Sequence, residues 1–171
     1  MRLVKYALGF ILLLIVALVF FAPKKELYFL LEKQIAKEGV VISGEQISQN
    51  PVGLKLQNPH IYYRGINSAK AKQITATVLL LFNRVEVREL QVDDSLYSMF
   101  PVAVQVARLD YLLWQPLKIK VLLKGNFGTA AGYYDILKRD LKIRLIKAED
   151  ISAIKRHLKK DDRGWFYELK L

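Results

Sequence analysis

The chain opens with an unbroken apolar segment and continues with short stretches in which apolar and polar residues alternate. Residues 6–22 (YALGFILLLIVALVFFA) carry no charge. At about 1.5 Å per residue they make a helix of roughly 25 Å, close to the ~30 Å hydrocarbon core of a bilayer. The pattern predicts a transmembrane anchor over residues 6–23. The residues that we assign to it are Tyr6, Phe10, Leu13, Val16, Phe20 and Ala22.

Two other interpretations fit an apolar segment at this position. A cleaved signal peptide has small residues before the cut, whereas bulky Phe20 stands two places before the candidate Ala22, and the apolar run is longer than the usual ~7–15 residues. A buried core helix has a similar composition. We favour an uncleaved anchor. Because Arg2 and Lys5 precede it, the positive-inside tendency puts residues 1–5 in the cytoplasm and the rest of the chain outside.

The first element after the anchor is a predicted helix over residues 24–38. Leu27, Leu31 and Ile35 recur at four-residue spacing, and Gly39 stands where a left-handed C-cap belongs. From residue 40 the apolar period changes to two, which predicts strands. These strands cover residues 40–43, 52–57, 59–64, 66–82 and 84–93, with a turn at Asn83-Arg84 and a bulge near Glu89.

The second half of the chain repeats the two-residue period. Strands are expected over residues 102–107, 117–124, 125–136, 141–146 and 165–171. A second helix is expected over residues 149–160, since Ile151, Ile154 and Leu158 would share one face. Turns of two to five residues favour antiparallel pairing. The predicted fold is mainly β: a transmembrane helix, then a curled antiparallel meander of about nine strands over residues 24–171, an open barrel or trough with two short helices.

The alternation gives this sheet one apolar face and one basic face. A sheet of this size curls, and its apolar face then points inward. The interior either closes on its own side chains as a core or stays open as a groove able to hold acyl chains. The sequence leaves both open. The residues that we expect on this trough-like face are Val78, Leu80, Phe82, Val104, Val106, Ile119, Val121, Ile143 and Leu145.

The net charge of +11 favours an anionic neighbour. The basic positions of the second half are Lys118, Lys120, Lys124, Lys142 and Arg144. They form either a solvated face that protects against edge aggregation or a surface that contacts anionic lipid headgroups. An anchored domain outside the cytoplasm makes a lipid bilayer the expected partner and nucleic acid an unexpected one.

Residues for catalysis are scarce. The chain has no cysteine, which excludes disulfides and thiolate zinc sites. His60 and His157 lie almost a hundred residues apart without carboxylates at ligand spacing, and neither a P-loop nor a nucleophile elbow is present. We therefore expect a non-enzymatic protein without cofactor or metal site.

Two families share features with this chain. The anchor, the short helix, Gly39–Gly44 and the following strands resemble the start of AsmA-like envelope proteins. The second half resembles the type II secretion system protein N family in Phe100-Pro101, Pro116-Leu-Lys-Ile-Lys, Gly125-Asn-Phe-Gly128 with Gly132, and Gly164-Trp-Phe-Tyr. The resemblance implies a bacterial inner-membrane protein facing the periplasm, an accessory subunit of a type II secretion-like or envelope assembly system with other envelope proteins as partners. The alternative is a lipid-binding or lipid-transfer module that uses the trough.

Overall fold

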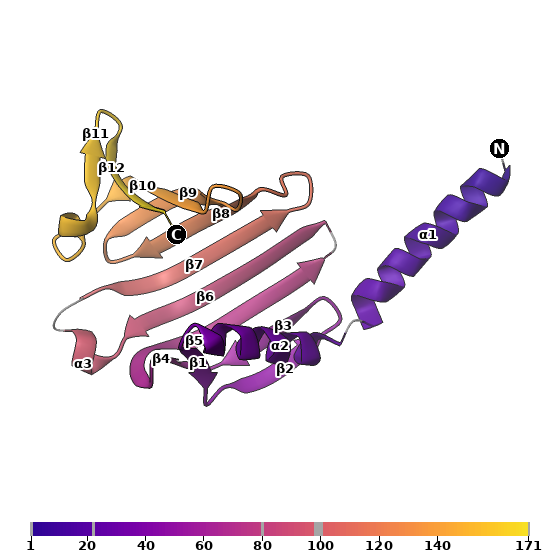
Figure 1. Cartoon of the computed structure of the whole chain (residues 1–171), viewed down its shortest axis with the longest axis horizontal. Helices are drawn as coiled ribbons and strands as arrows, with labels where there is room; N and C mark the ends of the chain where they lie inside the picture. Colours follow the sequence, from indigo (N-terminus) through magenta and orange to yellow (C-terminus); the bar gives the residue numbers. More distant parts are fainter. Residues whose placement is uncertain (1, 22, 80, 98–100, 171) are drawn as a thin grey trace.

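An apolar helix stands apart from a curved antiparallel sheet in the computed structural model, which describes residues 2–21, 23–79, 81–97 and 101–170 (Figure 1). Helix α1 (Arg2–Phe21) is long and apolar enough to cross a membrane. Its membrane-length window is not packed into the domain, which argues against a buried core helix. The side chains of Tyr6, Phe10, Leu13, Val16 and Phe20 are exposed, and Ala22 lies outside the described residues.

The remaining chain forms one sheet with short helical segments. The N-terminal elements are α2 (Lys24–Lys37), β1 (Val40–Ser43), β2 (Gln46–Asn50), β3 (Gly53–Gln57), β4 (His60–Tyr63), β5 (Ile66–Leu79), β6 (Phe82–Val92) and α3 (Asp94–Tyr97). The C-terminal elements are β7 (Ala103–Leu112), β8 (Lys118–Gly125), β9 (Gly128–Asp135), β10 (Asp140–Ala148), the 3₁₀ turn η1 (Lys155–His157), β11 (Lys159–Asp161) and β12 (Gly164–Lys170).

The strands form an open antiparallel meander, as the short turns predict. Neighbours run β1-β4-β5-β6-β7-β8-β9-β10-β12-β11, and β3 joins β2 to the second half of the long β5. The described residues make twelve strands, whereas the sequence predicts ten strand ranges in a meander of about nine; β2 and β11 are the two strands that were not expected. Only Ile47 is apolar in β2, so this strand has no alternating pattern to reveal it.

The two predicted helices have different outcomes. Helix α2 forms where its period places it, and Gly39 follows with φ of +83°. The helix expected over residues 149–160 is wrong. The Asp150 carboxylate accepts hydrogen bonds from the backbone N–H and hydroxyl of Ser152, which holds a turn instead of a helix. Lys159–Asp161 then pairs with β12 as a short hairpin, so only the η1 turn remains helical.

Irregularities in the central strands change the face that side chains occupy. Glu89 has φ of +51° and pairs with neither neighbouring strand, but the registers of β6 with β5 and β7 do not shift there, so the bulge predicted near Glu89 stays a prediction. The register between β7 and β8 shifts between Val104 and Val106, because Gln105 is an extra residue. An extra residue of this kind moves the side chains on its two sides to opposite faces.

The C-terminal strands β9 and β10 approach closely at Gly132. A Cβ atom there would overlap the backbone carbonyl oxygen of Lys142 and lie 2.7 Å from the Cα of Ile143 on β10. Gly132→Ala should therefore lower the free energy of unfolding by roughly 3 kcal/mol through overpacking. Thermal unfolding followed by circular dichroism measures the effect.

The control is Gly65→Ala. Nothing lies within 4 Å of a Cβ there, and φ is +81°, so only the backbone cost of about 1 kcal/mol is expected. Equal losses in the two variants would show that the β9–β10 approach does not require glycine.

Candidate functional site

One face of the sheet is apolar and concave. In the ladders, Leu54 lies opposite Ala76, Ala76 opposite Val85, and Val85 opposite Leu109. The same row continues through Val121 and Gly132 to Ile143. Residues that pair directly point to the same face, so this row crosses the sheet on one side. We call this face the trough.

The N-terminal side of the trough is covered by α2. Tyr28 is buried on Leu54 and Leu56, with Ile47 and Ile74 packed around them. The Tyr28 hydroxyl donates a 2.8 Å hydrogen bond to the Glu45 carboxylate. Burial and this carboxylate raise the pKa of Tyr28, so the hydroxyl stays protonated at neutral pH.

Helix α2 also presents leucines toward the open part of the trough. Leu27 and Leu31 lie beside Ala76 and Val78 in a groove of about 150 Å³. Both leucines are more than half exposed. Helix α2 therefore forms an apolar wall along one side of the trough.

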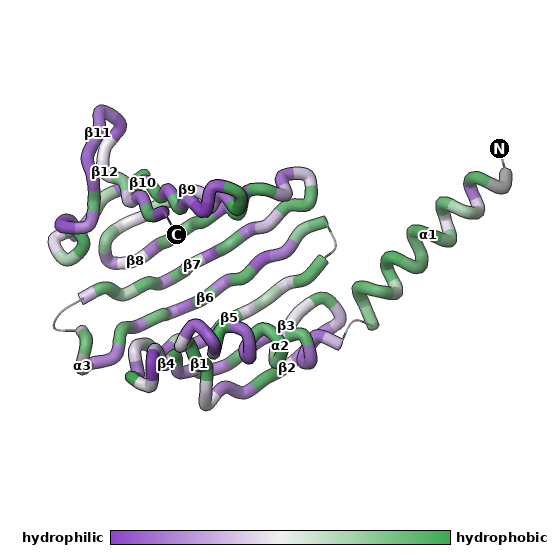
Figure 2. The backbone as a smooth tube through the Cα atoms, viewed as in Figure 1, coloured by the Kyte–Doolittle hydropathy of each residue, from purple (hydrophilic) through white to green (hydrophobic). Residues whose placement is uncertain are grey.

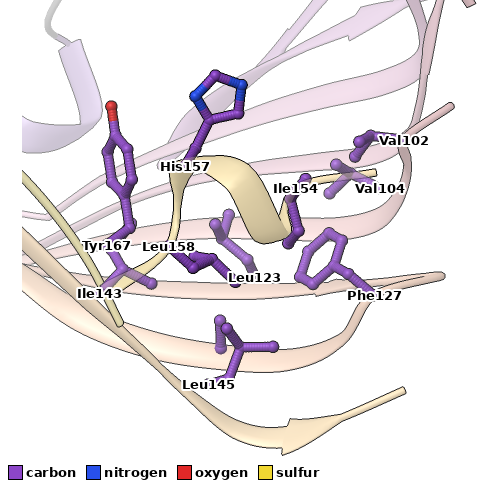
Figure 3. Close-up of a pocket in the computed structure, with 11 residues that line it drawn as sticks. Val102, Val104, Leu123, Phe127, Ile143, Leu145, Ile154, His157, Leu158 and Tyr167 are labelled. Atoms are coloured by element: carbon purple, nitrogen blue, oxygen red, sulfur yellow. The ribbon is translucent and has the colours of Figure 1, made fainter. Parts of the chain in front are cut away.

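A cavity of about 390 Å³ lies at the C-terminal side of the trough, under the segment of residues 151–158 (Figure 3). Its lining comes from β7 to β10, β12 and this segment: Val102, Val104, Leu123, Phe127, Ala130, Ile143, Leu145, Ile154, His157, Leu158 and Tyr167. The Tyr167 hydroxyl and the His157 ring lie on the opposite side of the group from Leu145 (Figure 3). The volume falls at the lower end of the range for small-molecule pockets.

The centre of the trough, between α2 and the 151–158 segment, has no covering element among the described residues. Its floor is formed by β5 to β8, whose side chains here are Ile74, Ala76, Val78, Asn83, Val85, Val87, Ala107, Leu109, Tyr111, Ile119 and Val121. Val85 and Leu109 face each other across two central strands, and these residues are 38% and 43% exposed. An apolar strip around them, with Asn83 and Tyr111 in the next row, therefore remains open to solvent between the two covered sides.

Most of the residues expected in the trough lie there. Val78, Ile119 and Val121 form part of the floor, and Val104, Ile143 and Leu145 line the cavity. Leu80 lies outside the described residues.

Two of the expected trough residues lie on the opposite, convex face. Phe82 does so because it pairs with Leu79 at the start of β6, so the chain reverses before Phe82 rather than at Asn83-Arg84. Phe82 lies under the Arg84 guanidinium. Val106 does so because Gln105 is bulged, and it pairs with Arg88 and Lys124.

Some residues of the site have no feature in the sequence that marks them. Phe127 stands in a two-residue turn between Gly125 and Gly128, and Tyr167 alternates in the last strand without a feature that marks it. Ile154 and Leu158 have the expected four-residue spacing but reach the cavity from a turn rather than from a helix.

The convex face carries the predicted basic residues, and several of them are paired. Lys118, Lys120, Lys124, Lys142 and Arg144 all lie on this face. Arg144 makes two hydrogen bonds of 2.6 and 2.7 Å to the Asp161 carboxylate, which lowers the pKa of Asp161 to about 2. Lys142 lies 3.6 Å from Glu168. Contact of this face with anionic headgroups stays a prediction, and the paired cations have less free charge for it.

A second cluster of ion pairs crosses the convex face of β6 and β7. Glu86 is buried and accepts hydrogen bonds from Arg88 at 2.6 Å and from Arg108 at 2.8 Å. The bond from Arg88 is the main cause that lowers the pKa of Glu86, and Arg108 adds to it against the effect of burial. Arg84 pairs with Asp110 beside them at 2.6 Å. Of the described residues, no group of three His, Cys, Asp or Glu side chains could hold a metal ion.

The Glu86 cluster predicts a pH-dependent contribution to stability. Glu86→Gln should lower the free energy of unfolding at pH 7 by roughly 2 kcal/mol, because two charge-assisted hydrogen bonds are weakened. The folded-state pKa of Glu86 lies below its ordinary value of 4.5. The stabilisation is therefore complete above pH 4.5 and is lost as the pH falls through the folded-state pKa.

Unfolding of wild type and Glu86→Gln measured between pH 7 and acid should show curves that converge at low pH. Glu89→Gln on the same strand is the control. Glu89 pairs with Lys72 while both side chains are more than half exposed, so a change below about 0.5 kcal/mol is expected. A difference between wild type and Glu86→Gln that is constant with pH would contradict the assignment.

Comparison of the chain with models of protein families, with curated proteins and with solved structures finds no match. The resemblance to the AsmA-like proteins and to the type II secretion system protein N family therefore stays a prediction. The function is argued from the geometry of the trough.

Proposed function

We propose that this chain is a single-pass membrane protein that binds a lipid acyl chain in the trough, without catalysing a reaction. The membrane is proposed to be a bacterial inner membrane with the sheet domain on the periplasmic side, following the cations that precede α1. The observation that carries the proposal is the exposure of Val85 and Leu109 at the centre of a concave apolar face.

An open apolar strip of this kind is costly to leave in water. Burial of apolar surface contributes about 25 cal/mol per Å², and contiguous exposed apolar patches mark ligand or interaction sites. The trough differs from a flat patch because α2 and the 151–158 segment wall it on both sides. A narrow, apolar and elongated ligand fits this shape.

The dimensions of the trough suit an acyl chain. Strand β7 has ten residues, which at about 3.3 Å per residue gives a floor of roughly 33 Å. One leaflet of the ~30 Å hydrocarbon core is about 15 Å deep, which is the depth that an acyl chain fills. The floor is therefore long enough for a complete acyl chain.

The role of a secretion-system accessory subunit, which the family resemblance implies, stays a prediction. The described residues present no feature that favours it over lipid binding. We therefore place the lipid-binding alternative first.

Crosslinking with a photoactivatable lipid tests the proposal in the full chain. The protein is reconstituted into vesicles that contain a phospholipid with a diazirine in its acyl chain, irradiated, and analysed by peptide mass spectrometry. Crosslinks are expected both in α1 and in peptides of β6 and β7 around Val85 and Leu109. Crosslinks confined to α1 would contradict acyl-chain binding in the trough.

Leu109→Gln should weaken binding without unfolding the sheet, because Leu109 is already 43% exposed. Loss of a buried leucine contact of about 1.5 kcal/mol corresponds to roughly tenfold weaker binding. Crosslinking in the trough should fall accordingly, while crosslinking in α1 serves as an internal reference. Val106→Gln, on the opposite face of the same strand, is the matched control and should retain wild-type crosslinking.

A further inference from the structure

The turns at one end of the sheet carry exposed apolar residues. They are the β5–β6 turn with Leu81, the β7–β8 turn of residues 113–117 and the β9–β10 turn of residues 136–139. Trp114 is 64% exposed and Leu137 is 72% exposed. Gly, Pro, Asn, Asp and Ser are the usual turn residues, so tryptophan and leucine at these tips have no local structural role to explain them.

These three turns lie at the end of the sheet that is next to α1, which we call the anchor end. In an antiparallel meander every second turn falls at the same end, and Figure 1 shows the β5–β6 and β7–β8 turns on the side of α1. The start of α2 at Lys24 lies there too, beside the Asn50-Pro51 turn and near Val78.

The chain holds this end close to the point where α1 ends. Phe21 and Lys24 are three residues apart, a span of at most about 11 Å. The Lys24 ammonium donates a 2.8 Å hydrogen bond to the carbonyl oxygen of Val19 in the last turn of α1. The anchor end therefore lies at the surface of whichever bilayer contains α1.

The opposite end of the sheet has a different composition. Its described turns contain Arg64-Gly65, Asp93-Asp94, Asn126 and Glu149-Asp150, with Phe127 buried. Ile66 and Tyr97 are exposed there, in separate elements beside polar turns. The acids Asp93, Asp94, Glu149 and Asp150 distinguish this end from the anchor end by charge, whereas Figure 2 shows a hydrophobic segment, α3, at this end as well.

Cations accompany the apolar tips at the anchor end. Lys118 directly follows the β7–β8 turn, and Lys138 and Arg139 belong to the β9–β10 turn, which Asp135 and Asp140 flank. The three cations are exposed, whereas the two aspartates are half-buried. Apolar and aromatic tips flanked by Lys and Arg are the combination that suits a membrane interface, where the rings enter the headgroup region and the cations meet lipid phosphates.

We infer that the anchor-end turns dock into the interface of the bilayer that holds α1, so that the trough stands on the membrane with one end at the lipid. The partner is a lipid surface, recognised by Leu81, Trp114 and Leu137 together with the adjacent cations. This docking goes beyond acyl-chain binding and does not require the trough to be occupied.

The two tryptophans allow a depth measurement in the full chain. Trp165→Phe leaves Trp114 as the sole tryptophan, and Trp114→Phe leaves Trp165, which lies at the start of β12 between Lys155 and Lys160. Each variant is reconstituted into phosphatidylcholine–phosphatidylglycerol vesicles with and without brominated acyl chains. Bromine should quench Trp114 at least about twofold more strongly than Trp165. Equal quenching of the two tryptophans would overturn the inference.

A labelling experiment gives a second measurement, because the chain has no cysteine. A polarity-sensitive fluorophore is attached to Leu137→Cys at the anchor end or to Asp94→Cys at the opposite end. Only the label at position 137 should be quenched by brominated lipid, and a water-exposed label at both positions would overturn the docking. Loss of crosslinks in the trough with retained quenching of Trp114 would reject acyl-chain binding but not docking. Retained crosslinks in the trough without quenching of Trp114 would reject docking but not acyl-chain binding.

Discussion

An open sheet with one apolar face must cover that face, and this requirement governs the rest of the structure. A closed barrel meets it by packing its own side chains inward. Here the edges β1 and β11 stay apart, and cover comes from α2 at one side and from the 151–158 segment at the other. Tyr28 buries Leu54 and Leu56, but nothing described reaches Val85 and Leu109. The proposed binding of an apolar ligand rests on this uncovered centre.

The fold class follows from the sequence because it depends on local periodicity. The two-residue period predicted the strands, and the four-residue spacing of apolar residues predicted α2. The short turns predicted antiparallel pairing. The face of the sheet that a side chain occupies depends less on the local sequence than the fold class does. Gln105 has no composition that marks a bulge, yet it separates Val104 and Val106 onto opposite faces. A chain reversal before Phe82, rather than after it as expected, does the same to Phe82.

The second predicted helix failed for a related reason. The apolar spacing of Ile154 and Leu158 suits a helix, and both side chains do reach the same cavity. The backbone does not form this helix. The Asp150 carboxylate accepts a hydrogen bond from Ser152 in a turn, and residues 159–161 pair with β12 as an edge strand. A helix of barely three turns has little intrinsic stability to oppose these contacts. The four-residue spacing correctly predicted that Ile154 and Leu158 meet. Pairing of residues 159–161 with β12 determined that a turn rather than a helix carries them.

The charged residues show the same contrast, since the local sequence predicts the face on which they lie but not their partners. The five basic residues of the second half share the convex face, as alternation predicts. Their pairing could not be predicted, because Arg144 and Asp161 come together only through the registers of β10, β12 and β11.

The position of the anchor gives the trough its orientation. A floor of roughly 33 Å is longer than the ~15 Å of one hydrocarbon leaflet. If α1 spans a membrane as proposed, the trough would hold an acyl chain at the surface of that same membrane. A trough that opens at the anchor end would let a chain move between bilayer and protein without crossing water, which is the step that costs most for an apolar ligand. The proposed docking would put the apolar turns in the lipid and the exposed floor next to them, with Val78, Tyr111 and Ile119 between the turns and Leu109 and with Asn83 as the polar member of that row.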